Sequence, residues 1–579
     1  MPRLDAARIV ELLRELAQRL ELEGGNPYRA RAYTRAADNL AVSPVPLAQL
    51  ISEGRLQDIP GVGEAIAAVI TKLYETGRHP QLEKMREKMP ASVLEMLRIP
   101  GLRPERIRKL HSELGIDSVA QLEQAALSGR LKSLKGYGPA FQAKLLQGIE
   151  FSRRPRGRHI HRAAAAMGYA IAELKHAHSD WTNLTPAGEF RRGCELVGPL
   201  VIVAADPKLH REKKIATTGD QLTIHVTAKE LFGVTLLLAT GSDRHIAALT
   251  AVARSKGWSL DAHGLRAKTR ILAGETEEEI YTTFGLPFIA PELRESGKEV
   301  QRALNGTLPE LVTIEDLHGV LHAHTDWSDG VDTLKVMAKA TRERGYAYLG
   351  LTDHSQSAHY AGGLKPDEVL RQQKDIDRLN SHSRNGFVVF RGIESDILAD
   401  GSLDYPPEIL DRFDLVIASV HSRFGMSKKD QTARIVKAVS NPYTTILGHI
   451  TGRQLLRRPG YEVDMEAILR ACAEHGVPIE INANPWRLDL DWRWCERALE
   501  LGCLFSINPD AHSTAEIDNM QWGVLMARKG AVPKARIVNA LGLEEFTAWL
   551  KQRRRPGQRR LKQRKSPLRQ RTKGDALVR

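Results

Sequence analysis

The stretch GVLHAHTDWSDG (319–330) decides the fold, because it joins a short apolar run to a cluster of metal-binding side chains. Such apolar runs recur with polar ends at 319–324, 348–354, 387–394, 414–421, 444–450, 478–483 and 503–512. Helical patterns lie between most of them, which predicts alternating strands and helices. In βα barrels the functional side chains lie at the C-terminal ends of the strands. We therefore expect an α/β barrel with its active face at these ends.

Six of the seven runs end in side chains that can bind a metal ion. These are His322, His324, His354, Glu394, His421, His449, Asp510 and His512, and Asp329 in the loop after the first run is a ninth. Imidazoles and carboxylates suit zinc, manganese or iron. A single strand-end histidine is more often an ordinary hydrogen-bonding residue. Nine candidate ligands at one rim of a barrel instead predict a metal site.

The segments HAHTDWSDG (322–330), LTDHS (351–355), GIESDIL (392–398), ASVHS (418–422), GHITGR (448–453) and NPDAHS (508–513) resemble the successive motifs of the PHP phosphoesterase superfamily. This resemblance implies a distorted (β/α)7 barrel in which the nine residues hold three ions, Mn²⁺ and/or Zn²⁺, that activate water for phosphodiester hydrolysis. Lys365, Arg423 and Arg453 follow the strand ends and are candidate contacts to neighbouring phosphates.

The first 150 residues contain a near-repeat, an apolar residue and a glycine turn followed by a helical pattern. Its copies are LQDIPGVG (56–63), LRIPGLR (97–103) and LKGYG (134–138). Glycine permits a positive φ, and the amides of a helix N-terminus can face a phosphate. The repeat resembles the helix-hairpin-helix motif, which implies sequence-independent contacts with the DNA backbone at Gly61, Gly63, Gly101, Gly136 and Gly138. The second copy departs from the motif, because Arg103 stands where a second glycine is expected.

Across residues 1 to about 548 the chain resembles the bacterial X-family DNA polymerases, PolX. Anchors of this resemblance are GNPYRARAY (25–33), IPGVG (59–63), PAGEFRR (186–192), TGS (240–242) and PELRE (291–295). It implies an N-terminal helical domain (1–95), a fingers-like helix-hairpin-helix region (96–154), a mixed α/β nucleotidyltransferase-like palm and thumb (155–300) and the PHP domain (317–548). A polar connector is expected near 295–316.

The polymerase site departs from this family. Nucleotidyl transfer needs carboxylates that hold two metal ions. Pro199, Val201 and Thr223 occupy the three aspartate positions, and Asp206 is the nearest leftover acid. Glu189 replaces the triphosphate-binding serine, and Leu238 and Ala239 replace a Tyr-Phe pair. We predict that this half keeps its fold but has no polymerase activity, and we therefore do not expect it to bind dNTPs. Mg²⁺ would be a cofactor only if the polymerase site were functional. Val69 stands at the position of the Schiff-base lysine, one turn from Lys72, so lyase activity is not predicted.

The net charge of +14 belongs mostly to the C-terminus, where residues 551–579 hold 13 lysines and arginines against one acid. This predicts a disordered basic tail (549–579) that favours polyanions; the alternative is a solubilising extension. We find no apolar run of membrane-spanning length and no signal peptide, and the four cysteines form no CxxC pair. These features predict a cytoplasmic protein without a membrane partner.

Together these resemblances imply a DNA-repair enzyme. The expected activity is a 3′–5′ exonuclease, a 3′-end processing enzyme or an abasic-site nuclease, acting on gapped, nicked or single-stranded 3′ ends. Three alternatives stay open: an active DNA polymerase with exonuclease, a small-molecule phosphatase of the histidinol-phosphate kind, and a non-catalytic DNA-binding scaffold.

Overall fold

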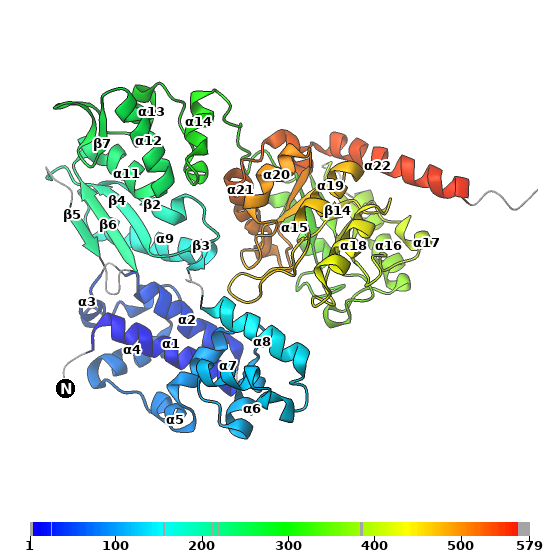
Figure 1. Ribbon diagram of the computed structural model, residues 1–579, viewed down its shortest axis with the longest axis horizontal. Coiled ribbons are helices and arrows are strands. Elements are labelled where there is room, and N and C mark those ends of the chain that lie inside the picture. Colours follow the sequence, from blue (N-terminus) through cyan, green and yellow to red (C-terminus); the bar gives the residue numbers. More distant parts are fainter. Residues whose placement is uncertain are drawn as a thin grey trace, which may run out of the picture. The chain divides into compact units, whose positions relative to one another are not determined.

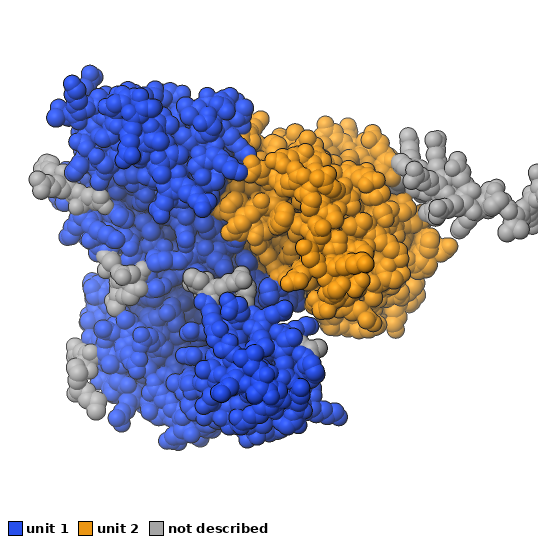
Figure 2. Space-filling view, in the orientation of Figure 1, with its two compact units in different colours: residues 1–308, 454–459 blue, residues 309–453, 460–579 orange. Residues whose placement is uncertain are grey.

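The computed structural model describes residues 4–24, 26–43, 45–153, 157–209, 213–216, 221–382 and 386–564. It divides into two compact units, coloured separately in Figure 2. Unit 1 comprises Met1–Leu308 with Gln454–Pro459, and unit 2 comprises Pro309–Arg453 with Gly460–Arg579. Within the described ranges every helix is too short or too polar to traverse a lipid bilayer.

Unit 1 begins with a bundle of helices (Figure 1). They are α1 (Ala6–Glu23), α2 (Pro27–Leu40), α3 (Leu47–Ser52), α4 (Glu64–Thr76), α5 (Pro80–Lys88), α6 (Pro104–Leu114), α7 (Val119–Leu127) and α8 (Pro139–Ser152). The 3₁₀ turns η1 (Leu56–Asp58), η2 (Ala91–Arg98) and η3 (Arg130–Ser133) precede α4, α6 and α8. Helix α1 begins at a capping bond from the Arg8 amide to the Asp5 side chain, and it ends at Gly24 in the left-handed conformation.

The three predicted hairpin turns share one backbone geometry. The first glycine of each has a positive φ, of 89° at Gly61, 78° at Gly101 and 92° at Gly136. The second position is different, because it caps the following helix with a negative φ, −89° at Gly63 and −70° at Arg103. A residue with a side chain adopts that conformation without strain. The second copy therefore forms the same turn with an arginine in place of the expected glycine.

The rest of unit 1 is mixed α/β. It contains β1 (Arg158–His159), α9 (Ile160–Ala177), β2 (Thr182–Ala187), α10 (Gly188–Arg191), β3 (Leu196–Val197), β4 (Leu200–Ala205), β5 (Lys213–Ala216) and β6 (Leu222–Thr227). Then follow η5 (Lys229–Leu231), α11 (Phe232–Thr240), α12 (Asp243–Ser255), β7 (Ser259–Asp261), β8 (Gly264–Ala267), β9 (Arg270–Ala273), α13 (Glu277–Phe284), η6 (Pro291–Leu293) and α14 (Lys298–Leu304). The main sheet has the strand order β2-β4-β6-β5.

Helix α14 corrects the expectation of a polar connector from 295. Its apolar residues Val300 and Ala303 lie three positions apart and pack into the core of the α11–α13 region. Spacing of this kind places both side chains on one helix face. The charged residues around them hid this short amphipathic helix in the sequence.

Unit 2 is built on seven parallel strands in the order β10-β11-β12-β13-β14-β15-β16. They are β10 (Gly319–Ala323), β11 (Tyr348–Leu351), β12 (Val388–Asp396), β13 (Leu415–Ser419), β14 (Ile446–Leu447), β15 (Ile479–Asn482) and β16 (Phe505–Asn508). A parallel bridge from Ala323 to Ala511 links the two edge strands, so the sheet is a nearly closed barrel. All seven apolar runs form strands, which confirms the predicted fold class.

Helices and short turns surround this barrel. They are α15 (Leu334–Glu343), η7 (His359–Ala361), α16 (Pro366–His382), α17 (Pro407–Leu410), α18 (Lys428–Val439), α19 (Met465–His475), η8 (Trp492–Trp494), α20 (Cys495–Glu500), η9 (Thr514–Asn519), α21 (Met520–Lys529), η10 (Lys534–Arg536) and η11 (Val538–Ala540). The side chains of Thr333, Ser427 and Asp464 cap α15, α18 and α19 and so mark where each helix begins.

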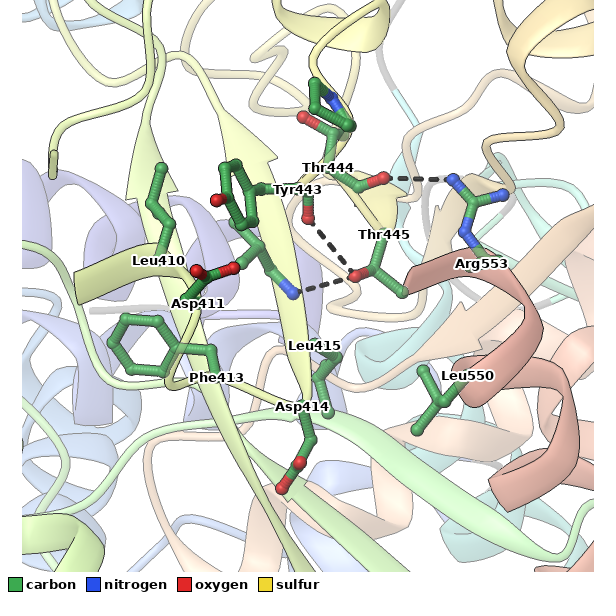
Figure 3. Close-up of a pocket in the computed structure, with 12 residues that line it drawn as sticks. Leu410, Asp411, Phe413, Asp414, Leu415, Tyr443, Thr444, Thr445, Leu550 and Arg553 are labelled. Atoms are coloured by element: carbon green, nitrogen blue, oxygen red, sulfur yellow. Dashed lines mark hydrogen bonds between the residues drawn. The ribbon is translucent and has the colours of Figure 1, made fainter. Parts of the chain in front are cut away.

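The last helix, α22 (Leu543–Arg564), packs its first turns against the residues at which strands begin, since Phe546 and Leu550 share a core with Tyr348, Leu415 and Ile446. Phe546 is fully buried and stacks on Tyr348 with 4.6 Å between ring centroids. Arg553 donates a 3.0 Å bond to the Thr444 carbonyl beside a cavity of about 30 Å³, room for a single water molecule (Figure 3). Regular structure thus continues into the predicted tail as far as Arg564, and residues 565–579 lie outside the described residues.

Candidate metal centre

The nine predicted ligands converge at the opposite end of the barrel, where the strands finish. His322 lies in β10 and Glu394 in β12, and the other seven lie in the segments that follow β10, β11, β13, β14 and β16. We call these nine residues the metal centre. His322 and His324 are fully buried, whereas the side chains of Asp329 and His512 are 33% and 31% exposed. The centre therefore opens to solvent on the side of Asp329 and His512.

Glu394 lies in the middle of the metal centre. Its carboxylate oxygens lie near five imidazole nitrogens: 3.0 Å from His354 Nδ1, 3.0 Å from His449 Nε2, 3.2 Å from His421 Nε2, 3.4 Å from His322 Nε2 and 3.7 Å from His324 Nε2. The residue is 1% exposed. A carboxylate in this position can bridge two cations through its two oxygens.

Two aspartates complete the ligand set on either side of Glu394. Asp510 Oδ1 lies 3.3 Å from His324 Nε2 and 3.6 Å from His322 Nε2. Asp329 Oδ1 lies 3.3 Å from His512 Nε2 and 3.6 Å from His354 Nε2. Three overlapping groups result, each with all ligand atoms within 4.8 Å of one another: His322, His324 and Asp510; His324, Asp329, His354 and His512; and His354, Glu394 and His421.

Buried nitrogens without partners test whether the centre fits metal ions. His322 Nε2, both ring nitrogens of His324 and His354 Nδ1 have no hydrogen-bond partner among the described residues. Leaving such a buried polar atom unsatisfied costs about 1–3 kcal/mol. A cation between these nitrogens and the carboxylates would satisfy them, so the side chains fit a metal site.

The charges of the centre also favour cations. Burial by itself raises the carboxyl pKa values of Glu394 and Asp510, but the surrounding imidazoles overcome this and hold both well below their ordinary values. Burial and the neighbouring imidazoles lower the pKa of His354 to about 3, despite the opposing charge of Glu394. Burial lowers the pKa values of His421 and His512, but the neighbouring carboxylates raise both to about 9, so a binding metal ion would displace protons from these two imidazoles.

A layer of buried carboxylates behind the ligands escaped the sequence analysis. Glu480 in β15 accepts a 2.6 Å bond from His322 Nδ1, and Asp396 in β12 accepts a 2.6 Å bond from His421 Nδ1. Such partners orient a metal-binding imidazole and direct its other nitrogen at the ion. The signal was present in the run PIEINA (478–483), where an acid interrupts apolar residues in a strand that supplies none of the nine ligands.

The predicted phosphate contacts have different surroundings. Arg453 is held inside unit 2, since it donates 2.6 Å and 3.0 Å bonds to the Asp491 carboxylate and the Arg487 carbonyl. Lys365 and Arg423 are exposed, and their roles stay predictions. Arg487, which the sequence analysis did not single out, places Nε 3.3 Å from Asp510 Oδ2. This makes Arg487 the basic residue that directly contacts the metal centre.

The polymerase half places its substituted positions side by side. Val201 in β4 pairs directly with Thr223 in β6. Glu189 Oε2 accepts a 2.7 Å bond from the Gly198 amide, just before Pro199. Asp206 is engaged elsewhere, by the Trp181 indole at 3.2 Å. Within the described residues, the groups able to hold a metal ion all lie in unit 2.

Known proteins match both the N-terminal and the C-terminal part of the chain. Residues 5–79 match the model of a helix-hairpin-helix domain, residues 93–146 that of a SAM-like helix-hairpin-helix tandem, and residues 235–295 that of the DNA polymerase beta thumb. The DNA polymerase/3′-5′ exonuclease PolX of Bacillus subtilis is 33% identical over 94% of this chain and 99% of its own length. The chain belongs to the PolX family.

The C-terminal part of this PolX chain also has shorter relatives. A probable phosphatase of Thermoanaerobacter sp. (strain X514) is 26% identical over 40% of the chain and 94% of its own length. A probable phosphatase of Caldicellulosiruptor bescii is 33% identical over the same shares. The PolX assignment, the helix-hairpin-helix domains and the PHP-type barrel are thereby confirmed as predicted.

Proposed function

We propose that this PolX protein is a metal-dependent nuclease that removes nucleotides or blocking groups from DNA 3′ ends, and that its polymerase half binds DNA without extending it. The observation that carries the proposal is the convergence of nine candidate ligand side chains at one end of the barrel, with buried nitrogens that lack a hydrogen-bond partner among the described residues and that a cation would satisfy. The printed name of the Bacillus subtilis relative includes a 3′–5′ exonuclease, which supports the same reaction.

The nine side chains would hold up to three divalent cations, with Mn²⁺ and Zn²⁺ suited to this mixture of imidazoles and carboxylates. Bound cations would supply an acidified water and offset the charge that grows on the phosphate oxygens. The chain itself fixes the geometry: Glu480 and Asp396 hold His322 and His421 in orientation. Arg487 lies beside Asp510 and is placed to bind a phosphate oxygen on the substrate.

The polymerase half supports DNA binding and not synthesis. Valine and threonine cannot act as anionic ligands, and Val201 and Thr223 are neighbours on the sheet where carboxylates would have to meet. Glu189 adds a negative charge to the turn in which triphosphate oxygens would be bound. The helix-hairpin-helix turns remain intact and offer backbone amides to DNA phosphates.

The deciding experiment uses the full-length protein with Mn²⁺ or Zn²⁺ and a primer–template DNA labelled at either the 5′ or the 3′ end of the primer. We expect stepwise shortening of the 5′-labelled strand and no extension when dNTPs are added. Template-directed extension would refute the inactive polymerase. Hydrolysis of free phosphomonoesters with no action on DNA would instead favour a small-molecule phosphatase.

Two variants separate a nuclease from a binding scaffold. His322→Ala with His324→Ala should abolish cleavage and reduce the bound metal, while DNA binding through unit 1 persists. His382→Ala is the matched control, because His382 is an exposed histidine at the end of α16 in the same unit. Equal nuclease activity in the double variant and in this control would overturn the assignment.

A further inference from the structure

An exposed tyrosine lies at the metal centre. Tyr360 belongs to η7, in the segment that follows β11, and 70% of its surface is exposed. Its ring centroid nevertheless lies 6.0 Å from that of His354 and 6.3 Å from that of His421. Both imidazoles are nearly buried ligands in contact with Glu394. Tyr360 is therefore an aromatic residue beside the ligands with much of its surface open to solvent.

The orientation of the ring leaves room for a stacking partner. The planes of Tyr360 and the two imidazoles meet at 60° and 65°, so neither histidine stacks parallel to it. A phenol is uncharged near neutral pH, so the side chain adds no charge that would repel a phosphate.

Two other aromatic rings in segments that follow barrel strands already have a partner. Trp327, in the segment after β10, lies beneath the Arg371 guanidinium at 5.8 Å from the ring centroid. Phe424, after β13, stacks on Tyr461 at 5.8 Å with an angle of 15° between the rings. Of these three rings, Tyr360 has the exposure that a new stacking partner needs. The same rim carries an exposed apolar side chain at Val331, whose amide donates a 2.8 Å bond to the His512 carbonyl.

We propose that Tyr360 is a specificity-determining residue that stacks on the nucleobase of the 3′-terminal nucleotide while the scissile phosphate lies at the metal centre. This inference rests on the proposed nuclease function and names its substrate class, an unpaired 3′ end. A nucleobase is joined to its phosphate through the sugar, so a phosphate held among the ligands places the base at the rim of the centre, where Tyr360 lies. A paired terminal base must break its pair and leave the stack before it can turn toward Tyr360, so the contact selects frayed or single-stranded ends.

The expected effect follows from the energy of base stacking. Aromatic–base stacking contributes about 1–3 kcal/mol per base, a factor of roughly 5 to 150 in binding or in kcat/KM. The contribution should disappear when the terminal nucleotide has no base. It should persist when only the hydroxyl group of the tyrosine is removed, because the ring supplies the contact.

The kinetic test compares two single-stranded oligonucleotides, one with an ordinary 3′-terminal nucleotide and one ending in an abasic analogue. We expect Tyr360→Ala to lower kcat/KM about 5- to 150-fold for the first and to change it less than threefold for the second. Tyr360→Phe should behave as the wild type on both. An equal loss on both substrates would mean that Tyr360 acts on the phosphate or the metal ions, and no loss on either would also refute the proposal.

A binding measurement distinguishes failure of this inference from failure of the nuclease assignment. The Mn²⁺-loaded protein, with Tyr360 either intact or replaced by alanine, is titrated with an oligonucleotide that carries 2-aminopurine at its 3′ end, joined by a linkage that resists hydrolysis. Stacking quenches this fluorophore, so we expect quenching only with Tyr360 intact, and none when the probe lies several nucleotides inward. Quenching by a wild-type protein that cleaves no DNA would refute the nuclease and keep the stacking site. Equal quenching with and without Tyr360 would refute the stacking site alone.

Discussion

Replacement of Glu480 by glutamine should weaken metal binding although none of the nine candidate ligands is replaced. The Glu480 carboxylate is fully buried and receives four bonds, from His322 Nδ1 at 2.6 Å, the His449 amide at 2.8 Å, Asn508 Nδ2 at 2.9 Å and Asn482 Nδ2 at 3.0 Å. All four partners donate. Each oxygen accepts two of these bonds, so the amide nitrogen of a glutamine would face two donors and two bonds are lost. The bond that orients His322 also loses its charge, which weakens it.

The magnitude follows from the role of such a carboxylate. Loss of a group that orients a metal-binding histidine lowers metal affinity or activity about 10- to 100-fold, equal to ~1.4–2.7 kcal/mol. Each unsatisfied buried donor costs a further ~1–3 kcal/mol of folding free energy. We therefore expect Glu480→Gln to need 10- to 100-fold more Mn²⁺ for half-maximal nuclease activity and to unfold at a lower temperature in the presence of a chelator.

Unit 1 supplies a matched control. Glu299 is also buried and accepts a 2.8 Å bond from a histidine, His245 Nδ1, but it lies outside the metal centre. Glu299→Gln should lower stability and leave the Mn²⁺ titration unchanged. Wild-type metal affinity and activity in Glu480→Gln, measured by calorimetry and by the nuclease assay, would refute the orienting role of Glu480.

Three further predictions concern stability and DNA binding. Glu277→Ala should cost about 3–5 kcal/mol of the unfolding free energy of unit 1, because it strips a carboxylate partner from fully buried Arg294. Burial raises the pKa of Glu277, but Arg294 and Arg191 together lower it by more, so the net pKa lies below the ordinary value of 4.5. The ionised carboxylate therefore stabilises unit 1 fully above pH 4.5, and this stabilisation disappears as the pH falls through the lowered pKa. An acid titration monitored by circular dichroism checks this. Phe546→Ala should cost ~3–5 kcal/mol in unit 2, measured by denaturant unfolding. Gly101→Ala should weaken DNA binding and stability, because the φ of 78° at Gly101 is strained for a residue with a side chain. Arg103→Gly should leave the turn geometry unchanged, because φ there is −70°. Equal effects of the two changes would contradict this account.

The sequence was sufficient to predict the barrel and the convergence of the nine candidate ligands at one rim, since both depend on local patterns. Each strand is a short apolar run, and each ligand is a polar residue at the end of such a run or in the loop that follows, so periodicity and strand direction together predict one common rim. The family resemblance then predicted the helical and palm domains. In the helical domain the turns at Gly61 and Gly136 have the expected positive φ.

Other features depend on contacts between residues far apart in the chain. Glu480 and His322 are 158 positions apart, and nothing local marks the glutamate as a partner of that histidine. The sequence position of Arg453 suggests a contact with phosphate, whereas in the fold its guanidinium donates a hydrogen bond to Asp491. The polar character of residues 295–316 concealed α14, because two apolar side chains are enough to attach a short helix to a preformed core.

The central position of Glu394 has a consequence for how metal ions load. Because one carboxylate adjoins side chains from all three candidate groups, binding of one ion would alter the affinity for the next. The first cation would fix the positions of the carboxylate and of the imidazoles that the groups share. The next cations would then bind with a smaller loss of side-chain entropy. A titration of the metal-free protein should then show cooperative uptake with partial loading scarcely populated, and activity that rises more steeply than the first power of metal concentration.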